Sequence, residues 1–373
     1  MKIIIAGDLV VDCEYHDSKI DKDLVSLFNS ADLRIVNLEA PVTTSRSKIV
    51  RTGPHLKANQ ESTKNVLNLL GIDIVTLANN HIKDFDSNGV LDTIAFLHKN
   101  NIKTVGAGKN LSEARKTLYV DTNEGRIAIV NFAENEWASA TENTAASNPM
   151  DIIDNARQIQ EARNLADYVF VIIHGGHEYY NLPSPRMQKQ YRFYAEQGAD
   201  IIIGHHTHCI GGHEIYNGVP IYYSLGNFLF TKNNKSQEWY TGLVLEVEIS
   251  NGVINPKLHP VQQEKESFSL SLLQDIEKQK VLNRIEIYSR VIADRTKLSE
   301  AWEMYIDKQS KVYLDYWSQL TFINNRYFKG AIHKLGLNKI FYSRKATALY
   351  LNLMRCEVHR DLSMQVLNNK LAK

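Results

Sequence analysis

Three histidines within four residues make the segment from Ile201 to His208 the clearest chemical signal in the sequence. It reads Ile-Ile-Ile-Gly-His-His-Thr-His. The three β-branched apolar residues predict a buried strand, and the glycine predicts where that strand ends. Neutral histidine is the commonest nitrogen ligand of zinc, iron and manganese ions, and closely spaced imidazoles can face one ion. The segment therefore indicates a metal site or, as the plainer alternative, a solvated histidine-rich turn.

Five further apolar runs end in the same way, at a glycine or at residues that can bind a metal. They are Lys2–Ala6 before Gly7 and Asp8, Leu33–Val36 before Asn37 and Glu39, Ile72–Ala78 before Asn79, Asn80 and His81, Tyr168–Ile173 before His174, and Val219–Leu225 before Gly226 and Asn227. Ligands collect outside the carboxyl ends of parallel strands. We therefore expect these strand ends and the histidine segment to converge on one crevice.

The two carboxylates at these strand ends, Asp8 and Glu39, favour a bound cation. An uncompensated buried charge costs several kcal/mol, on the order of the desolvation penalty of an ion, and a nearby cation removes that cost. The alternatives are a turn or helix-capping role for Asp8 and an ordinary surface position for Glu39. Their occurrence together with the histidines favours the metal.

The third and fourth runs end in Asn80, His81 and His174, which add other kinds of ligand. An amide oxygen coordinates a cation without adding charge, and an adjacent histidine can act as an acid beside the metal. The alternatives are a left-handed turn made by the paired asparagines and a hydrogen-bonded core histidine. Further along, Glu178 could orient a histidine ligand through the free ring N–H.

Composition places the chain among ordinary globular proteins. Its 373 residues, 43% hydrophobic and 23% charged, allow two or three domains. Three widely spaced cysteines, Cys13, Cys209 and Cys356, argue against a disulfide framework and fit a reducing compartment. The first apolar run is too short for a signal peptide, and no run approaches the length of a membrane span. We therefore predict a cytoplasmic location, with peripheral membrane attachment as an open alternative.

The net charge of +1 conceals a basic C-terminal segment. Residues 326–373 contain ten lysines or arginines and two acids, so this segment carries +8 and the rest of the chain −7. Such a segment could bind an anionic membrane surface, an acidic polymer or a nucleic acid, or it could be a solvated helical face. We favour the solvated face, expect no nucleic-acid partner, and leave oligomerisation open.

Prolines and glycines mark a boundary near residue 260. All eight prolines lie at or before Pro260, and only two glycines lie beyond it. Apolar residues then recur at helical spacing from Phe268 onward, and again over 301–320 and 346–367. We predict a domain over residues 1–260 and a helical region over 261–373, with a lid, a dimer interface or a membrane-surface anchor as its open roles.

Strands alternate with helical segments in the first domain, which predicts an α/β fold. The expected helices are Asp21–Phe28, Glu61–Leu70, Asn88–Asn100, Ile152–Leu165 and Met187–Gln197. Repeated strand–helix–strand units predict a largely parallel or mixed sheet that is covered on both faces. The later segments Pro220–Tyr223 and Gly242–Ile249 are expected to add antiparallel edge strands.

Six motifs, in this order, resemble CapA-like proteins, the poly-gamma-glutamate capsule synthesis family, itself similar to calcineurin-like metallophosphoesterases. They are Gly7-Asp8, Asn37-Leu38-Glu39-Ala40-Pro41, Ala78-Asn79-Asn80-His81 with Asp84 and Gly89, His174-Gly175-Gly176-His177-Glu178-Tyr179, Gly204-His205-His206-Thr207-His208 and Tyr223-Ser224-Leu225-Gly226-Asn227-Phe228. The resemblance covers about residues 1–249. It implies a four-layer α/β/β/α metallophosphoesterase-type domain followed by the C-terminal helical region.

The resemblance also implies divalent metal ions, two of them, of manganese, iron or zinc. One ion would lie near Asp8, Glu39 and His208, and the other near Glu39, Asn80, His174 and His206. His81 would protonate the leaving group, with Asp84 orienting it. The ions would activate the attacking water and clamp a phosphoryl oxygen.

Two departures from the phosphoesterase pattern weaken one of the two ion sites. Val10 stands where a histidine is usual, and Glu39 stands where the bridging aspartate is usual. The site could therefore hold one ion only, hold the second weakly, or recruit His205, His177 or Asp84. We predict that an anionic substrate meets four basic residues, namely Arg51, His55, Arg186 and His205.

Three functions follow from these features. The first, which we favour, is a metal-dependent phosphoesterase that acts on a phosphorylated or anionic polymer precursor in capsule or surface-polymer synthesis. The second is a non-catalytic capsule-assembly component that binds an acidic polymer or partner proteins. The third is a metal-dependent amide or ester hydrolase, since the same activated water would attack a carbonyl group.

Overall fold

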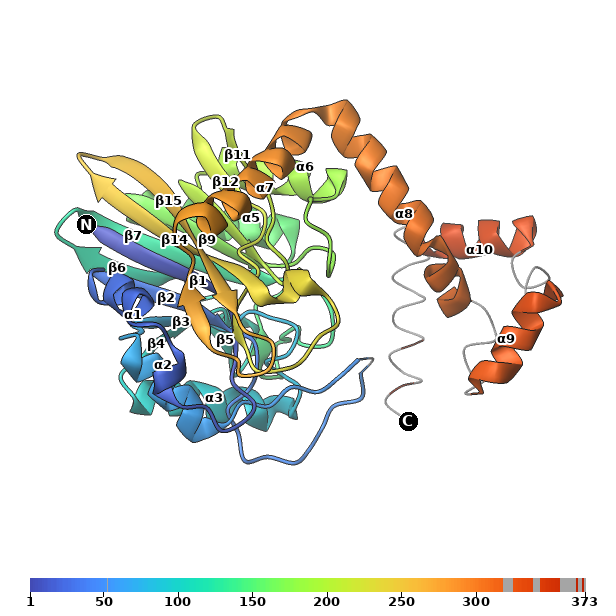
Figure 1. The fold of residues 1–373 in the computed structure, drawn as a ribbon, viewed down its shortest axis with the longest axis horizontal. Coiled ribbons are helices and arrows are strands. Elements are labelled where there is room, and N and C mark those ends of the chain that lie inside the picture. Colours follow the sequence, from blue (N-terminus) through green and yellow to red (C-terminus); the bar gives the residue numbers. More distant parts are fainter. Residues whose placement is uncertain (52, 318–324, 338–342, 356–366, 368–370, 372–373) are drawn as a thin grey trace. The chain divides into compact units, whose positions relative to one another are not determined.

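The chain forms two compact units, Met1–Ser299 and Glu300–Lys373. The computed structural model describes residues 1–51, 53–317, 325–337, 343–355, 367 and 371 (Figure 1). The first unit holds every strand that the structure describes and every residue of the predicted site. In the described part of the chain, no helix combines the length and the hydropathy that crossing a bilayer requires.

The first sheet has eight strands and contains the N-terminal strand at its centre. Its order is β16-β15-β14-β1-β2-β3-β4, with β13 also paired to β1. The strands are β1 (Lys2–Val10), β2 (Leu33–Leu38), β3 (Ile74–Thr76), β4 (Lys103–Val105), β13 (Asn227–Phe230), β14 (Thr241–Ser250), β15 (Val253–Gln263) and β16 (Leu270–Leu272). β1, β2, β3 and β4 run parallel, so their carboxyl ends share one edge.

The second sheet has six strands in the order β11-β12-β10-β9-β7-β6. The strands are β6 (Leu118–Thr122), β7 (Gly125–Ala133), β9 (Tyr168–His174), β10 (Ile201–His205), β11 (His213–Tyr216) and β12 (Val219–Tyr222). β7, β9, β10 and β12 are parallel. A small third sheet pairs β5 (Ala107–Gly108) with β8 (Ala146–Ser147).

Helices cover the outer faces of the two large sheets. The first unit contains α1 (Lys22–Asn29), α2 (Gln60–Leu69), α3 (Asp86–Lys99), α4 (Leu111–Ala114), α5 (Ile152–Leu165), α6 (Pro185–Glu196) and α7 (Asp275–Ala293), and the short 3-10 helices Asp17–Lys19 and Gln237–Tyr240. α8 (Arg295–Trp317) begins in the first unit, and α9 (Arg326–Lys334) and α10 (Arg344–Arg355) lie in the second.

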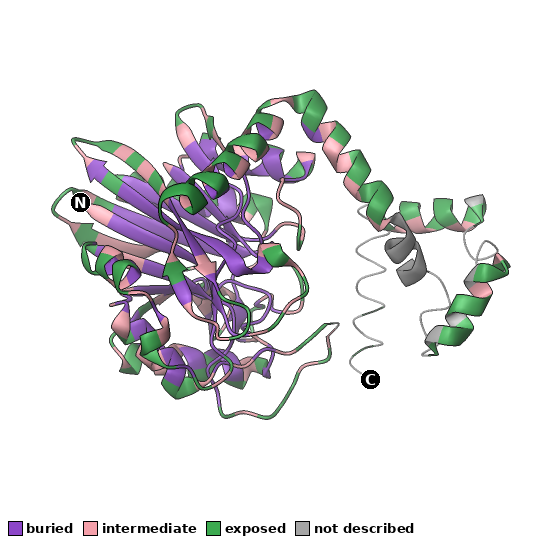
Figure 2. Cartoon of the chain, in the orientation of Figure 1, coloured by how far each residue is buried: buried purple, intermediate pink, exposed green. Residues whose placement is uncertain are grey.

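Alternating side chains of the strands build three hydrophobic layers. In β1, Ile3 and Ile5 face the second sheet, where Phe170 and Ile172 meet them. Ile4, one residue away, faces the opposite side, with α1, α2 and α3. The second sheet packs its other face on α5 and α6. These three cores, purple along the strands in Figure 2, give the four layers α/β/β/α that the resemblance implied.

The helix predictions agree with the structure within a few residues, but the predicted sheet is corrected in two respects. The two large sheets stack face to face, whereas the strand pattern alone predicted one sheet covered on both faces. The segments expected at edges are interior, because β14 lies between β1 and β15 and β12 lies between β10 and β11. Alternating polarity therefore did not mark edges here.

The first unit ends about forty residues beyond the predicted boundary at 260, at Ser299. α7 packs on the sheets through Val281, Ile285 and Ile292, all buried. Leu298, in the first turn of α8, is also buried. The scarcity of prolines and glycines after residue 260 indicates where the chain becomes helical. The end of the compact unit is set instead by the packing of the apolar side chains of α7 against the sheets. The predicted helical run over 346–367 corresponds to α10, and residues 356–366 lie outside the described part.

Truncation tests this boundary. We expect a chain ending at Ser299 to keep the unfolding temperature of the first unit. A chain ending at Gln274, which keeps β15 and β16 but lacks α7, should be destabilised by several kcal/mol, since each buried side chain of α7 contributes about 1.5–3 kcal/mol. Thermal unfolding followed by circular dichroism would check this. Equal stability of the two truncated chains would contradict the role given to α7.

Candidate metal centre

The predicted ligands meet where parallel strands of both sheets end. Asp8 lies near the end of β1, and Glu39 directly follows β2. His174 is the last residue of β9, and the segment containing His206 and His208 follows β10. All of these side chains are at least 95% buried. Six apolar runs spread over two hundred residues thus deliver polar groups to one point.

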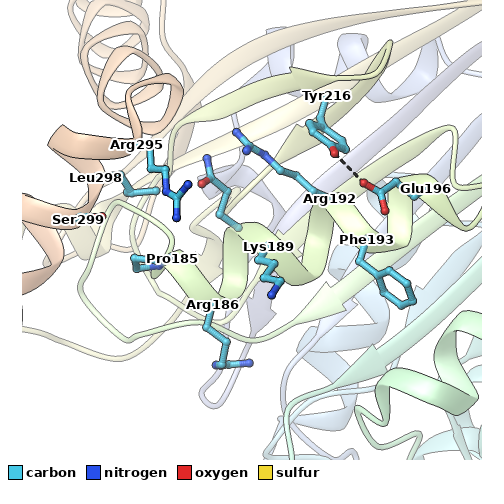
Figure 3. A pocket seen from close by; sticks show the side chains of 11 residues that line it. Pro185, Arg186, Lys189, Arg192, Phe193, Glu196, Tyr216, Arg295, Leu298 and Ser299 are labelled. Carbon is cyan, nitrogen blue, oxygen red and sulfur yellow. Dashed lines mark hydrogen bonds between the residues drawn. The ribbon is translucent and has the colours of Figure 1, made fainter.

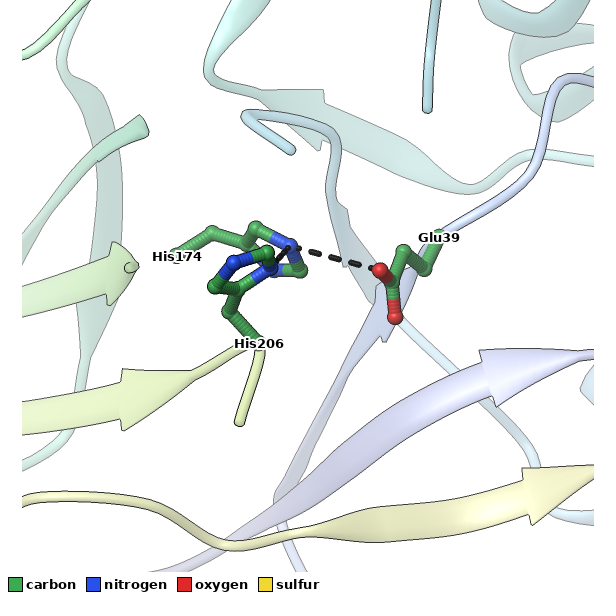
Figure 4. A group of neighbouring side chains, drawn as sticks. All are labelled: Glu39, His174 and His206. Atoms are coloured by element: carbon green, nitrogen blue, oxygen red, sulfur yellow. Dashed lines mark hydrogen bonds and ion pairs between the residues drawn. The ribbon is translucent and has the colours of Figure 1, made fainter. Parts of the chain in front are cut away.

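Four ligand atoms face one another around the first candidate position. The Nε2 atom of His174 lies 3.0 Å from His206 Nδ1, 3.1 Å from Asn80 Oδ1 and 3.4 Å from Glu39 Oε1. Figure 4 shows the two imidazoles and the carboxylate directed toward each other. With metal–ligand bonds of about 2.1 Å, neighbouring ligand atoms lie about 3.0–3.4 Å apart. The spacing therefore fits a single cation.

A second group uses the same carboxylate. Asp8, Glu39 and His208 each offer an atom within 4.8 Å of the others. His208 Nε2 lies 3.8 Å from Glu39 Oε1, and its Nδ1 lies 2.9 Å from Asn227 Oδ1. Asn227 thus holds the ring so that Nε2 faces the carboxylate. Glu39 stands between the two groups, as the resemblance implied for the bridging residue.

Asp8 is held in its charged form by the groups around it. Asn37 Nδ2 donates to Oδ1 at 2.7 Å, and the backbone N–H of His206 donates to Oδ2 at 3.1 Å. His205 Nδ1 lies 3.2 Å from Oδ1. Burial alone would raise the pKa of Asp8, but His205 close to Oδ1 and the charges of the surrounding histidines hold it well below its usual range. Asp8 is therefore a carboxylate prepared for a cation.

Glu39, unlike Asp8, receives no hydrogen bonds from the described residues, and its surroundings show whether the cluster suits a metal ion. Its side chain is fully buried, and neither carboxylate oxygen accepts a hydrogen bond from any described residue. Burial, followed by the negative charge of Asp8, raises the pKa of Glu39 well above its ordinary value. A buried carboxylate without donors requires a proton or a cation. Nitrogen and oxygen donors converge on it, so the residues fit a divalent metal ion.

His81 stands beside the ligands in a network of its own. Its Nδ1 lies 2.6 Å from Asp84 Oδ2, and Arg51 forms a short ion pair with Asp84 Oδ1. Arg51 Nη1 also donates to the Asn80 carbonyl at 3.0 Å. Burial lowers the pKa of His81, and Asp84 opposes that shift. The network fixes the ring through Nδ1 and leaves Nε2 as the nitrogen that can transfer a proton.

Three polar residues around the ligands were not assigned to the site from the sequence. Asn37 contacts Asp8, and Asn227 contacts His208; both lie in the predicted motifs, and their place at strand ends was the available signal. Glu136 lies 3.6 Å from His206 Nε2 and 3.4 Å from Asn80 Nδ2. Glu136 follows β7, an apolar run that ends in the acids Glu134 and Glu136. The pattern of an apolar run followed by polar residues, applied to this strand, would have identified it.

Backbone strain collects at the same place. His206, His208 and Tyr179 have φ angles of 92°, 55° and 61°, in the left-handed region that bulky residues seldom adopt. Each such residue costs on the order of 1–3 kcal/mol. The Tyr179 ring lies 6.3 Å from that of His208 and is 46% exposed. The strained turns thus set the positions of two candidate ligands, His206 and His208, and of Tyr179, which lies partly exposed beside them.

Of the four residues expected to bind substrate, the side chains of His205 and Arg51 are buried, whereas for His55 and Arg186 that role stays a prediction. His205 is 1% exposed and contacts Asp8, so it orients this carboxylate and cannot meet a substrate in this structure. Arg51 is 4% exposed at its side chain and engaged by Asp84. His55 Nε2 lies 2.8 Å from the Ile49 carbonyl, within its own loop. Arg186 is exposed and pairs with Glu134 at 2.8 Å.

Comparison with known proteins identifies relatives of the same segment. The family model described as "Bacterial capsule synthesis protein PGA_cap" matches residues 2–232. The "PGA biosynthesis protein CapA" of Bacillus subtilis is 38% identical over 55% of this chain and 54% of its own length. The "Capsule biosynthesis protein CapA" of Bacillus anthracis is 35% identical over 52% and 49%. The matched segments thus span about half the length of these curated relatives.

Solved structures share parts of the arrangement at low identity. A hypothetical protein from Thermus thermophilus is 16% identical, with a TM-score of 0.45 over 70% of this chain and 99% of that one. A putative 5'-nucleotidase from Staphylococcus aureus, solved in complex with alpha-ketoglutarate, is 14% identical, with a TM-score of 0.44 over 77% and 58%. At these scores the likeness says nothing about activity or substrate.

Replacing Glu39 tests whether its carboxylate is there for a cation. In chelator-treated protein at neutral pH, Glu39→Gln should raise the free energy of unfolding by about 1–3 kcal/mol, because it replaces a carboxyl group whose charge is disfavoured by burial with a neutral amide. The same change should abolish stabilisation by manganese. Denaturant unfolding with and without the metal measures both effects. A chelator-treated variant less stable than the parent would contradict this account of Glu39.

The contact between Asn227 and His208 gives a second test. Asn227→Ala should weaken metal binding by about 10- to 100-fold, since the ring loses the group that orients it. Titration calorimetry of the metal-free protein with manganese would measure the change. Asn143→Ala, in an exposed loop, is the control and should bind as the parent does. Unchanged affinity in Asn227→Ala would remove His208 from the ligand set.

Proposed function

Because the chain belongs to the bacterial capsule synthesis protein family PGA_cap, we propose that it is a metal-dependent phosphoesterase in the synthesis of a capsule or another surface polymer. The observation that carries the proposal is Glu39. This buried carboxylate accepts no hydrogen bond from described residues and faces histidines on two sides. Such an arrangement is unfavourable in an empty pocket and favourable around cations.

The proposed cofactors are two divalent ions of manganese, iron or zinc. Glu39, Asn80, His174 and His206 would hold one, and Asp8, Glu39 and His208 the other. Mixed imidazole, carboxylate and amide donors suit these metals. When bound, the ions would supply Lewis-acid activation of water and of a phosphoryl oxygen. The second group has three of these donors and the first has four, which favours tighter binding at the first.

The chain's own contribution to the reaction would be proton transfer by His81. Asp84 accepts from Nδ1 at 2.6 Å and thereby keeps the proton-transferring Nε2 in a fixed orientation. Arg51 balances the charge of Asp84, so that the pair does not add net negative charge beside an anionic substrate. Asp84 and Arg51 are positioning residues here, and His81 would be the catalytic acid.

The proposed substrate is a phosphorylated or anionic precursor of the polymer. Tyr179 provides an exposed aromatic surface beside His208, and its hydroxyl accepts from Asn234 at 3.1 Å. The ring is stacked on that of Trp239 at 6.2 Å. A substrate that reaches the cluster on this side would pack against a flat, fixed ring. Cytoplasmic location stays a prediction, and membrane contact and oligomerisation stay open alternatives.

Leaving-group dependence tests the role of His81. With the manganese-loaded chain, His81→Ala should lower kcat for phenyl phosphate by about 10²–10⁴-fold, the usual contribution of a general acid. The loss should be much smaller for p-nitrophenyl phosphate, because its leaving group departs without a proton. Metal content should not change. Stopped assays and metal analysis of the same samples provide both readouts.

The control for this test is His98→Ala, since His98 is an exposed histidine of α3 whose ring contacts Thr104. It should retain parental activity. A manganese-loaded parent chain that is inert toward phosphate monoesters and diesters would contradict the phosphoesterase proposal. If the chain hydrolysed carboxylic esters or amides instead, the same cluster would be the site of a metal-dependent amide or ester hydrolase.

A further inference from the structure

A cavity of about 760 Å³ that is lined by basic side chains lies along the outer side of α6, apart from the candidate metal centre. Arg186, Lys189 and Arg192, spaced three residues apart on α6, line it together with Arg295 from the first turn of α8 (Figure 3). Its lining residues all belong to the unit Met1–Ser299, and none is a candidate metal ligand. The volume is typical of a site for a small organic ligand.

Two of the four cations have their charge free for a ligand. Lys189 and Arg295 are exposed, and neither forms an ion pair with any residue that the structure describes. Solvent-exposed charges are common and by themselves indicate nothing. Here, however, both line one concave site of a size that holds a ligand, so their charges act on the same volume.

The other two cations are partly used but keep donors. Arg192 binds Glu214 through Nε and Nη2, at 3.0 and 2.6 Å, and Arg186 binds Glu134 and Gln190. A guanidinium has five N–H groups, so each arginine retains donors for a further acceptor. The two arginines are thereby fixed in position, which lowers the entropy lost when a ligand binds.

Among the described residues that line the cavity, one is an acid, and it lies at one end. Glu196 is ten residues from Arg186 along α6, which places their backbones about 15 Å apart. One of its oxygens accepts from the Tyr216 hydroxyl at 2.6 Å. At the end near Pro185 and Arg295 none of the described lining residues is acidic, and the first turn of α6 contains no acid, so the helix dipole adds to the positive potential there.

We propose that this cavity binds an anion with at least two acid groups, of the size of a short acidic oligomer. A row of cations along about 9 Å of helix axis matches charges distributed over a chain better than one small ion. Leu298 and Phe193 provide apolar walls for the carbon skeleton. The proposal goes beyond phosphoester hydrolysis, because it involves no residue of the metal centre.

Binding of two defined probes to the full chain tests the proposal. A γ-linked glutamate pentamer carries carboxylates, and tripolyphosphate carries phosphates; acetate is the singly charged control. We expect one pentamer or one tripolyphosphate to bind per chain, with affinity that falls as salt rises. The double variant Lys189→Gln/Arg295→Gln should raise the dissociation constant at least about tenfold, since two charge-assisted contacts are lost. Calorimetry measures both.

Two control variants distinguish binding in this cavity from binding elsewhere on the chain. Lys99→Gln/Arg157→Gln removes two exposed helical cations outside the cavity and should bind as the parent does. Glu39→Gln should also bind normally, whatever its effect on hydrolysis. The probe that binds identifies carboxylate or phosphate as the preferred group. Binding of neither probe, unchanged binding in the cavity variant, or equal loss in Glu39→Gln would overturn the proposal.

Discussion

The need to compensate a buried negative charge governs the structure around the ligands. Asp8 lies near the end of β1, and Glu39 directly follows β2; both side chains are fully excluded from water. Asp8 receives donors from Asn37 and the backbone of His206, whereas Glu39 receives none from the described residues. Without a cation, such a group costs several kcal/mol. A centre of this kind would lower the stability of the metal-free fold and favour the binding of a metal.

The stacked sheets supply the rigidity that such a centre requires. Strands from both sheets end at the same point, and their aliphatic side chains form one continuous layer between the sheets. This rigid support holds His206 and His208 at φ angles that their side chains disfavour. Where β1 meets β13, a Cβ on Gly7 would lie 2.1 Å from the Gly226 carbonyl oxygen, so only glycine permits that approach. Close packing thus fixes ligand positions that local preferences oppose.

Much of this could be predicted from the sequence, because apolar runs followed by polar residues report strand ends directly. The rule placed Asp8, Glu39, Asn80, His174 and the histidine segment together, and the structure brings them together. It missed Glu136 because the preceding strand was overlooked. It misjudged His205, which lies behind Asp8, since residue type alone does not say which face of a strand end a side chain occupies. The boundary at Ser299 depends on packing of α7, which composition does not encode.

Arg51 and Arg186 are paired with carboxylates of the protein, so a phosphoryl group near the candidate metal centre would depend on a bound cation for positive charge. Arg51 was expected to meet the substrate, but it is buried against Asp84, and Arg186 is held by Glu134. The positive charge that these side chains bring is therefore largely balanced by the protein's own carboxylates. A phosphoryl group entering beside Glu39 would therefore meet the negative charge of Asp8 with no free positive charge from these arginines. A cation held by the candidate ligands would reverse that potential, so in the proposed function the binding of an anionic substrate would depend on the loading of the centre.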